Sequence, residues 1–326
     1  MNMKKDVFNV LLLLALPASG KSEVRNFMAN IEAERLKRDF HVGANLQLDD
    51  FPYVFFMRRI DEELEKLNQA RMFYPGEVPF YDGRDWGTLC NLLNEDYHDL
   101  LNRTAIKVDS AAKYMFERID RAAQVVGIKP RLGLLNEEIR NKIADTLEEE
   151  AKVMIQNKVS QYTEDLDGKT IVIEMARGGK DGSSMPLTGT FGYQYTLRQF
   201  CPEILENAAI LYIWVTPEES RRKNDEREDP NNPGSNLNHK TPDEVMYNDY
   251  GCDDMLYLVE NSELKDTVTV KAYDETYYLP IGIFDNRVDK TTTLRQDPSK
   301  WDEELVKEVT ASINNATNTM WKNYKN

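Results

Sequence analysis

Long apolar runs are missing from this chain of 326 residues, and so is any excess of positive charge. No stretch approaches the ~20 consecutive apolar residues that a membrane-spanning helix needs, so we expect no membrane partner. Lysine and arginine number 41 against 56 aspartates and glutamates, which gives a formal net charge of −15. Because affinity for nucleic acid comes mostly from cationic side chains on phosphates, we expect no nucleic-acid partner either.

Cysteine is scarce as well. Cys90, Cys201 and Cys252 are odd in number and far apart in the sequence. They form no disulfide framework, which is typical of a reducing compartment and predicts a cytoplasmic protein. Residues 1–20 also have the outline of a secretory signal peptide, with two lysines, an apolar stretch and then small residues. Asp6 and Asn9 interrupt the approach to that stretch, so we favour a cytoplasmic chain.

The most informative segment is residues 15–22, which read Ala-Leu-Pro-Ala-Ser-Gly-Lys-Ser and directly follow the apolar run at 7–14. The run predicts a buried strand, and the loop after it matches G-x-x-x-x-G-K-[ST] except that Ala15 replaces the first glycine. Ala15 must then adopt the backbone angles of that glycine. A strand, a tight loop and a helix in this order predict a phosphate-binding loop for a nucleotide.

Each residue type in this loop has a chemical reason to be there. Backbone N–H groups at a helix N-terminus attract anions, and Gly20 lets the main chain approach phosphate oxygens without a Cβ. Lys21 supplies a compact positive charge for the phosphates, and the Ser22 hydroxyl is suited to ligate Mg²⁺. The predicted nucleotide-binding residues here are Pro17, Ala18, Ser19, Gly20, Lys21, Ser22 and Glu23.

Strand-like segments alternate with helical ones along the chain, which predicts βαβ units and a mostly parallel sheet. Ligands of such sheets gather at the carboxyl ends of the strands. The segments expected to be strands are 7–15, 42–48, 171–175, 209–215 and 279–284. We therefore predict an α/β fold of the P-loop NTPase type, a three-layer sandwich around a mostly parallel five-stranded sheet.

The interval between the second and third expected strands is too long for one crossover. It is rich in Glu, Lys, Arg and Leu at helical spacing, so we predict a large helical insertion at 53–166. The core then comprises 1–52 and 167–295, and 296–326 forms a C-terminal helix packed on it. The expected helices within the insertion are 57–70, 86–101, 105–126 and 136–159.

Acidic residues follow two of the expected strands. Asp49 and Asp50 come after the second strand, where a carboxylate can accept a proton from a substrate hydroxyl; the alternative is a helix N-cap. Glu174 ends the third strand, and an acid at the tip of an apolar strand predicts a metal or a cation beside it. We expect Glu174 to serve Mg²⁺, and the alternative is an ion pair with Arg177. Residues 177–180 predict a flexible basic turn.

Basic residues follow the fourth expected strand. Arg222 and Arg227 lie in a charged segment at 216–227, and arginines there are placed to stabilise charge on a transferring phosphoryl group. The alternative is a solvated helix whose glutamates and arginines pair with one another. Residues 229–242 are loop-like, as expected of a mobile lid.

Asn286 and Arg287 follow the last expected strand, and in P-loop folds this position lies near the nucleotide base. Both are expected to contact adenine by hydrogen bonding or stacking. With Asp289 they also form a faint echo of the guanine-reading N-K-x-D pattern, so the choice between adenine and guanine stays open.

Together these segments resemble the P-loop kinases of small molecules, with the uridine-kinase-like and zeta-toxin-like groups as the nearest. The resemblance rests on residues 15–22, Asp49 and Asp50, Glu174, residues 221–227, and Asp285 with Asn286. It implies ATP and Mg²⁺ as cofactors and phosphoryl transfer to a small hydroxyl-bearing or phosphorylated acceptor. Lys21, Asp49, Asp50, Arg222 and Arg227 would be the catalytic residues. The alternative is an NTP-hydrolysing switch whose helical insertion binds a protein partner.

Overall fold

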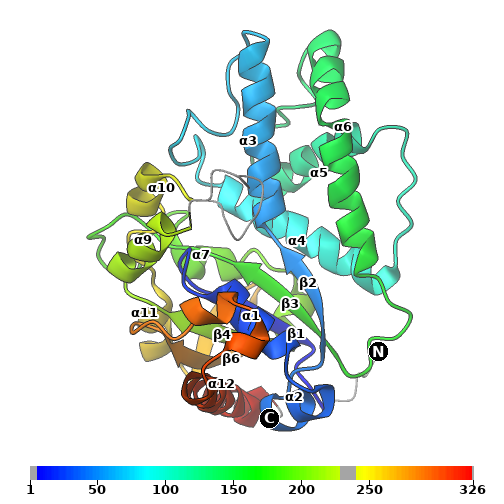
Figure 1. The fold of residues 1–326 in the computed structure, drawn as a ribbon. Coiled ribbons are helices and arrows are strands. Elements are labelled where there is room, and N and C mark those ends of the chain that lie inside the picture. The colour runs from blue at the N-terminus through cyan, green and yellow to red at the C-terminus, as the bar shows by residue number, and fades with distance from the viewer. Residues whose placement is uncertain (1–5, 228–239, 325–326) are drawn as a thin grey trace. The chain divides into compact units, whose positions relative to one another are not determined.

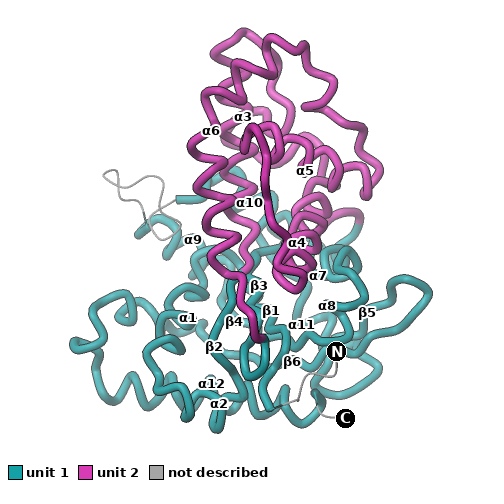
Figure 2. The backbone as a smooth tube through the Cα atoms, turned by 90° about the vertical axis from the view of Figure 1, so that its right-hand side faces the viewer, with its two compact units in different colours: residues 1–47, 166–188, 192–326 teal, residues 48–165, 189–191 magenta. Residues whose placement is uncertain are grey.

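The computed structural model describes residues 6–227 and 240–324, and the chain divides into two compact units (Figures 1 and 2). The first unit comprises Met1–Gln47, Leu166–Thr188 and Gly192–Asn326. The second comprises Leu48–Asp165 with Gly189–Phe191. The sequence placed a helical insertion at 53–166, and the second unit is where those helices occur.

A six-stranded sheet forms the centre of the first unit, in the order β2-β3-β1-β4-β6-β5. β1 pairs in parallel with β3 and β4, β4 pairs in parallel with β6, and β5 is antiparallel to β6. The predicted α/β class with a mostly parallel sheet is therefore confirmed. The strands are β1 Val10–Leu14, β2 Ala44–Asp49, β3 Lys169–Met175, β4 Ala208–Trp214, β5 Thr267–Ala272 and β6 Glu275–Asp285.

The predicted number of five strands is wrong, because β5 was missed and β6 begins earlier than expected. The two strands form a hairpin around Tyr273 and Asp274, whose φ values of 54° and 59° are both positive. This is the backbone of a tight two-residue hairpin turn. No glycine marks the turn, so the usual sequence signal for it was absent.

Successive side chains of each strand point to opposite faces of the sheet, and different helices pack against the two faces. All five residues of β1 are fully buried, as expected of a central parallel strand. Leu11 and Leu13 belong to a core cluster with residues of α1, α2 and α12, whereas Tyr212 on the opposite face meets Tyr193 of α7. The helices of this unit are α1 Lys21–Ala29, α2 Ala33–Phe40, α7 Gly192–Leu197, α8 Pro202–Asn207, α9 Pro217–Asp225, α10 Asp243–Asn248, α11 Met255–Glu260 and α12 Glu303–Tyr324, with short 3-10 helices η1 Thr292–Arg295 and η2 Pro298–Lys300.

The second unit is built from long helices whose turns are anchored by buried aspartates. Asp61 is fully buried and accepts hydrogen bonds from the backbone N–H groups of residues 72–74. Asp120 does the same for residues 131–133. Each carboxylate thus satisfies several backbone donors at a turn. The helices are α3 Phe51–Lys66, α4 Asp85–Asn102, α5 Ala111–Val125 and α6 Glu137–Ser160.

A buried ion network also joins the helices of this unit. Arg118 of α5 is almost fully buried and donates to Asp96 of α4 at 2.7 Å and to the hydroxyl of Tyr53 of α3 at 2.9 Å. Lys158 of α6 contacts Asp96 at 2.7 Å. Each charge has opposite-charge partners, which is the condition for burying them. Within the described residues, none of the helices combines the length and the apolar character needed to cross a bilayer.

Gly282 of β6 offers a test of how closely α12 packs on the sheet. A Cβ added at this glycine would lie 2.3 Å from the carbonyl oxygen of Ala316, so Gly282→Ala must push α12 outward. We expect the free energy of unfolding to fall by about 2 kcal/mol, measured by urea denaturation. The exposed Asn315→Ala on the same helix is the control, and it should cause no loss. Equal stability of the two variants would contradict this packing.

Candidate functional site

The 15–22 loop joins β1 to α1 at the carboxyl edge of the sheet, and its backbone explains its residue types. Gly20 has φ +103°, and a Cβ there would lie 2.4 Å from Oγ1 of Thr291, so only glycine fits. Ala18 has φ 54°. Ala15, which replaces the first glycine of the motif, is fully buried and is not among the residues with positive φ. The expectation that Ala15 must adopt glycine-like angles is therefore wrong, and alanine fits without strain.

Hydrogen bonds to its carbonyl groups hold the loop in place. Four side chains from different parts of the first unit each donate a hydrogen bond to one carbonyl oxygen. The bonds are Tyr193 Oη to Ala15 at 3.0 Å, Lys21 Nζ to Leu16 at 3.2 Å, Ser220 Oγ to Pro17 at 2.7 Å and Asn286 Nδ2 to Ser19 at 2.8 Å. The carbonyl dipoles are therefore engaged with the surrounding protein.

The backbone N–H groups of the same loop differ from its carbonyl groups in their bonding. Within the described residues, the backbone N–H groups of Ala18, Ser19, Gly20 and Ser22 donate to no protein acceptor. The Ser19 side chain is 1% exposed, and its Oγ has no hydrogen-bond partner in the described part of the chain. Unsatisfied buried polar atoms are rare and call for a bound water, ion or ligand. Donors gathered at a helix N-terminus, where the dipole is positive, favour the approach of an anion.

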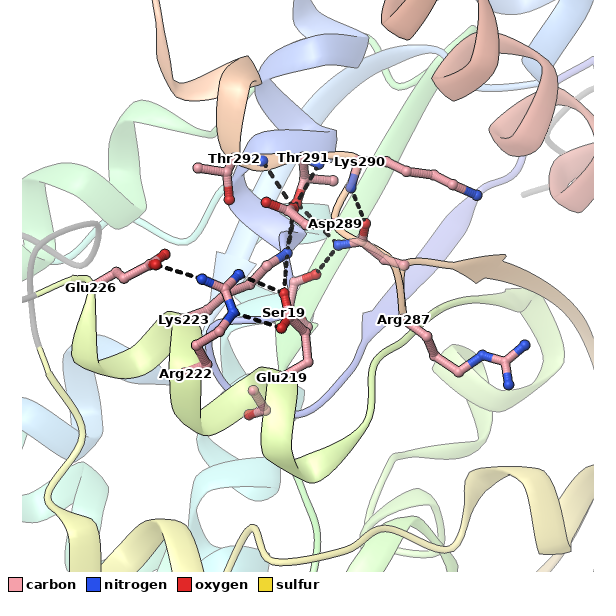
Figure 3. A network of polar contacts seen from close by, with 12 residues as sticks. Ser19, Glu219, Arg222, Lys223, Glu226, Arg287, Asp289, Lys290, Thr291 and Thr292 are labelled. Atoms are coloured by element: carbon pink, nitrogen blue, oxygen red, sulfur yellow. Dashed lines mark hydrogen bonds and ion pairs between the residues drawn. The ribbon is translucent and has the colours of Figure 1, made fainter.

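A buried ion pair lies behind this loop (Figure 3). Lys223 of α9 is fully buried, and its Nζ lies 2.6 Å from Oδ1 of Asp289. Asp289 also accepts from the backbone N–H groups of Thr291 and Thr292. Burial acts to raise the pKa of Asp289, but the hydrogen bonds from Lys223 and its neighbours hold it far below the ordinary value. Thr291 packs against Gly20, so this pair links α9 to the loop.

Asn286 has a different place from the one expected. It is fully buried; its Nδ2 donates to the Ser19 carbonyl and to Thr291 Oγ1, and its Oδ1 accepts from the N–H of Lys290. Direct contact with a base, as predicted, is not available to a side chain with no exposed surface. Asn286 instead positions the loop. Since Asp289 is bound to Lys223, the guanine-reading pattern is likewise used for structure.

Arg287 lies beside Asn286 but faces outward. Its side chain is 45% exposed, and its guanidinium stands 3.6 Å from the ring centre of Trp214. Asp285 holds two of its nitrogens, at 2.9 and 2.7 Å. The predicted contact between Arg287 and a base stays a prediction.

Glu174 is 5% exposed, and its partner is Arg25 of α1 at 2.7 Å rather than Arg177. Arg177 is also buried and donates to the carbonyl of Ala176 at 2.6 Å. The turn after β3 is not the flexible one expected. Gly179 exchanges backbone hydrogen bonds with Cys252, and a Cβ on Gly178 would lie 2.4 Å from the Cys252 carbonyl oxygen.

Oxygen ligands suited to Mg²⁺ are present on α1 and β3. Ser22 is half-buried, and Glu174 and Glu23 are buried carboxylates. Arg295 donates to Oε1 of Glu23 at 2.6 Å, while Oε2 is buried without a partner in the described part of the chain. Burial acts to raise the pKa of Glu23, but Arg227 and Arg295 outweigh it and keep it lowered. Hard oxygen donors of this kind fit Mg²⁺.

The two arginines expected to clamp the transferring group lie in different surroundings. Arg222 is about half exposed and pairs with Glu219 and Glu226, as the alternative interpretation of a solvated helix predicted. Arg227 follows α9, and burial lowers its pKa, which neighbouring Glu23 opposes. Its Nε is buried without a partner among the described residues. Most of the expected lid at 229–242 lies outside the described residues.

Asp49 and Asp50 belong to the second unit. Asp49 ends β2 and accepts from the N–H of Phe51 at 2.9 Å. Asp50 stands at the N-cap position of α3 and is buried, but its side chain makes no cap hydrogen bond. The alternative of a helix N-cap is therefore confirmed for the position of Asp50 but not for its side chain, and the catalytic roles of both aspartates stay predictions.

Several residues that hold the loop gave no signal in the sequence. Tyr193 and Ser220 lie more than 170 residues from the loop and belong to no motif. Tyr193 is fixed in turn by Asp254, which accepts from its N–H at 2.6 Å. Asp253 accepts from the hydroxyl of Tyr212 at 2.7 Å, and burial raises the pKa of Asp253 to about 6.

Comparison of the chain with protein-family models, with curated proteins and with solved structures finds no match. The function must therefore be argued from the geometry of the first unit.

The Lys223–Asp289 pair predicts a large loss of stability when it is broken. Lys223→Met leaves the partly buried Asp289 without its cation, so the free energy of unfolding should fall by about 3 kcal/mol. Arg222→Met on the same helix is the control, because its ion pairs are exposed and should contribute less than about 1 kcal/mol. Urea denaturation of both variants measures the difference. Similar values for the two would show that the buried pair does not hold this part of the fold.

The raised pKa of Asp253 predicts a pH-dependent stability. Above about pH 6 its carboxylate is charged in an environment that disfavours charge, so Asp253→Asn should raise the free energy of unfolding. The gain should grow as the pH rises from about 4, the ordinary pKa of aspartate, and should level off above about 6. Urea denaturation between pH 4 and pH 8 measures it, with the exposed Asp274→Asn as the control for charge removal. A gain that is the same at every pH would contradict the assignment.

Proposed function

We propose that this chain is an ATP-dependent phosphotransferase that acts on a small hydroxyl-bearing or phosphorylated molecule. The observation that carries the proposal is the state of the 15–22 loop. Its carbonyl groups are bonded to the protein, its amides at 18–20 and 22 meet no described acceptor, and a buried lysine stands at its end. These are the features that a loop needs in order to hold the phosphates of a nucleotide.

The residues around the loop would have separate roles in this reaction. The loop amides and Lys21 hold the phosphates. Ser22 and Glu174 would hold Mg²⁺, which when bound supplies charge neutralisation at the phosphate oxygens. Binding of the metal would compete with Arg25 for Glu174, since the two now form an ion pair.

Transfer itself needs positioning and charge rather than a covalent enzyme intermediate. The acceptor hydroxyl oxygen bonds to the terminal phosphorus, the bond from that phosphorus to the bridging oxygen breaks, and ADP leaves. Arg227 supplies positive charge that interacts with Glu23, the residue that follows the loop, and this carboxylate favours the charged form of Arg227. Arg222 remains a weaker candidate because its charge is neutralised by two glutamates on its own helix. Asp49 and Asp50 remain candidates for accepting the proton of the acceptor.

The proposal is tested by ATP turnover with a library of hydroxyl-bearing metabolites. We expect at least one acceptor to stimulate formation of ADP and to appear as a phosphorylated product by mass spectrometry. Lys21→Met should reduce this turnover about 100-fold or more, because a charge that stabilises the phosphates is lost. Lys307→Met, which changes an exposed lysine of α12, is the control and should leave turnover unchanged.

Two results would count against the phosphotransferase. ATP hydrolysis that no acceptor stimulates would favour the NTP-hydrolysing switch instead. Full activity of Lys21→Met, with circular dichroism showing a folded protein, would remove the 15–22 loop from the reaction.

A further inference from the structure

Arg25 of α1 and Glu174 of β3 form an ion pair at the edge of the sheet where the 15–22 loop begins. Glu174 is the register neighbour of Leu13, the last residue but one of β1, so it lies beside the strand that enters the loop. Arg25 follows Ser22 by three residues, and residues three apart share one face of a helix. The pair therefore lies on the side of α1 that also carries Ser22.

Arg25 is bound to this carboxylate in a way that allows it to leave. Its Nη1 donates to Oε2 of Glu174 at 2.7 Å, and within the described residues its side chain makes no other hydrogen bond. The side chain is 25% exposed, so a guanidinium released from Glu174 would be hydrated. Lys223 differs, because its side chain has no exposed surface beside Asp289.

The Glu174 carboxylate, in contrast, needs a cation to stay where it is. Its side chain is 6% exposed, and a buried carboxylate without an opposite charge is costly. Arg227 also interacts electrostatically with Glu174, but in the described part of the chain the ion pair of Glu174 is with Arg25. Oε1 of Glu174 accepts no hydrogen bond from the described residues. One oxygen is thus bound to a removable cation, and the other has no protein partner there.

We propose that Arg25 is an exchangeable counter-ion, which neutralises Glu174 in the absence of metal and releases this carboxylate to a divalent cation shared with Ser22. This inference rests on the proposed function, because it concerns the metal site of the same reaction. Two cations that compete for one carboxylate weaken each other's binding. Free metal should therefore bind weakly, and binding should become favourable when the oxygens of a polyphosphate add to the ligands.

Rescue of a destabilised variant by metal tests the inference without an activity assay. Arg25→Met removes the counter-ion of Glu174, so the urea midpoint of the full chain should fall in metal-free buffer. Mg²⁺ at about 10 mM should restore the midpoint, because a ligand that binds only the folded state stabilises it. The unchanged chain should respond much less, and NaCl at equal ionic strength should not replace Mg²⁺.

A direct binding measurement completes the test. Calorimetry with Mn²⁺, which prefers the same oxygen ligands as Mg²⁺, should give a dissociation constant roughly tenfold lower for Arg25→Met than for the unchanged chain. The double variant Arg25→Met, Glu174→Gln should lose this binding and the response to Mg²⁺. If Arg25→Met does not fold without metal, its refolding yield with and without Mg²⁺ gives the same comparison.

Arg131→Met is the matched control from the second unit. Arg131 is 16% exposed and pairs at 2.6 Å with Asp85, whose side chain is fully buried, so this pair is built like the one between Arg25 and Glu174. Its removal should also lower the urea midpoint. Mg²⁺ should not restore it, because the inference assigns exchange to the pair beside Ser22.

The outcomes separate the inference from the proposed function. A loss of stability in Arg25→Met that Mg²⁺ does not restore, with unchanged affinity for Mn²⁺, would overturn the inference and leave the pair with a structural role alone. Binding of inorganic tripolyphosphate with Mg²⁺ by the unchanged chain would then still support the proposed function. Rescue by Mg²⁺ in a chain that binds no tripolyphosphate would support the exchange at Glu174 and overturn the proposed function.

Discussion

The position of the 15–22 loop depends on a lysine that is buried against an aspartate. Removing Lys223 and Asp289 from water is costly, and their pairing offsets that cost only while both stay in place. Through Thr291 and Asn286 the pair reaches Gly20 and the Ser19 carbonyl. The loop is therefore fixed in place, so under the proposed function its amides would not have to be reorganised to bind an anion, which is the arrangement that makes electrostatic stabilisation effective.

The same constraint divides the charged residues around the loop into two groups. Lys223 and Asn286 have structural roles, because they are fully buried and form hydrogen bonds with protein atoms. The side chain of Arg287 is 45% exposed, and Nε of Arg227 is buried without a hydrogen-bond partner among the described residues. Charge alone does not separate these groups. Burial and hydrogen-bond partners separate them, and both make Arg227 a stronger candidate for the proposed reaction than the half-exposed Arg222.

Much of the fold could be predicted from the sequence, because the signals were local. The apolar run at 7–14 and the glycine and lysine at 20–21 lie next to each other, and the long helices of the second unit have clear periodicity. The arrangement behind the loop depends on contacts over long sequence distances, such as Tyr193 to Ala15 and Ser220 to Pro17. One sequence contains no signal for such pairs. The β5–β6 hairpin was missed for a local reason, since Tyr273 and Asp274 form its turn without glycine.

The central claim is that the amides of the 15–22 loop bind a polyphosphate, and nuclear magnetic resonance tests it most directly. In a ¹⁵N-labelled sample titrated with inorganic tripolyphosphate and Mg²⁺, the N–H signals of Ser19, Gly20 and Ser22 should shift downfield in a saturable way as they become hydrogen-bond donors. Unchanged signals at these three residues, at ligand concentrations that shift signals elsewhere in the chain, would contradict the account.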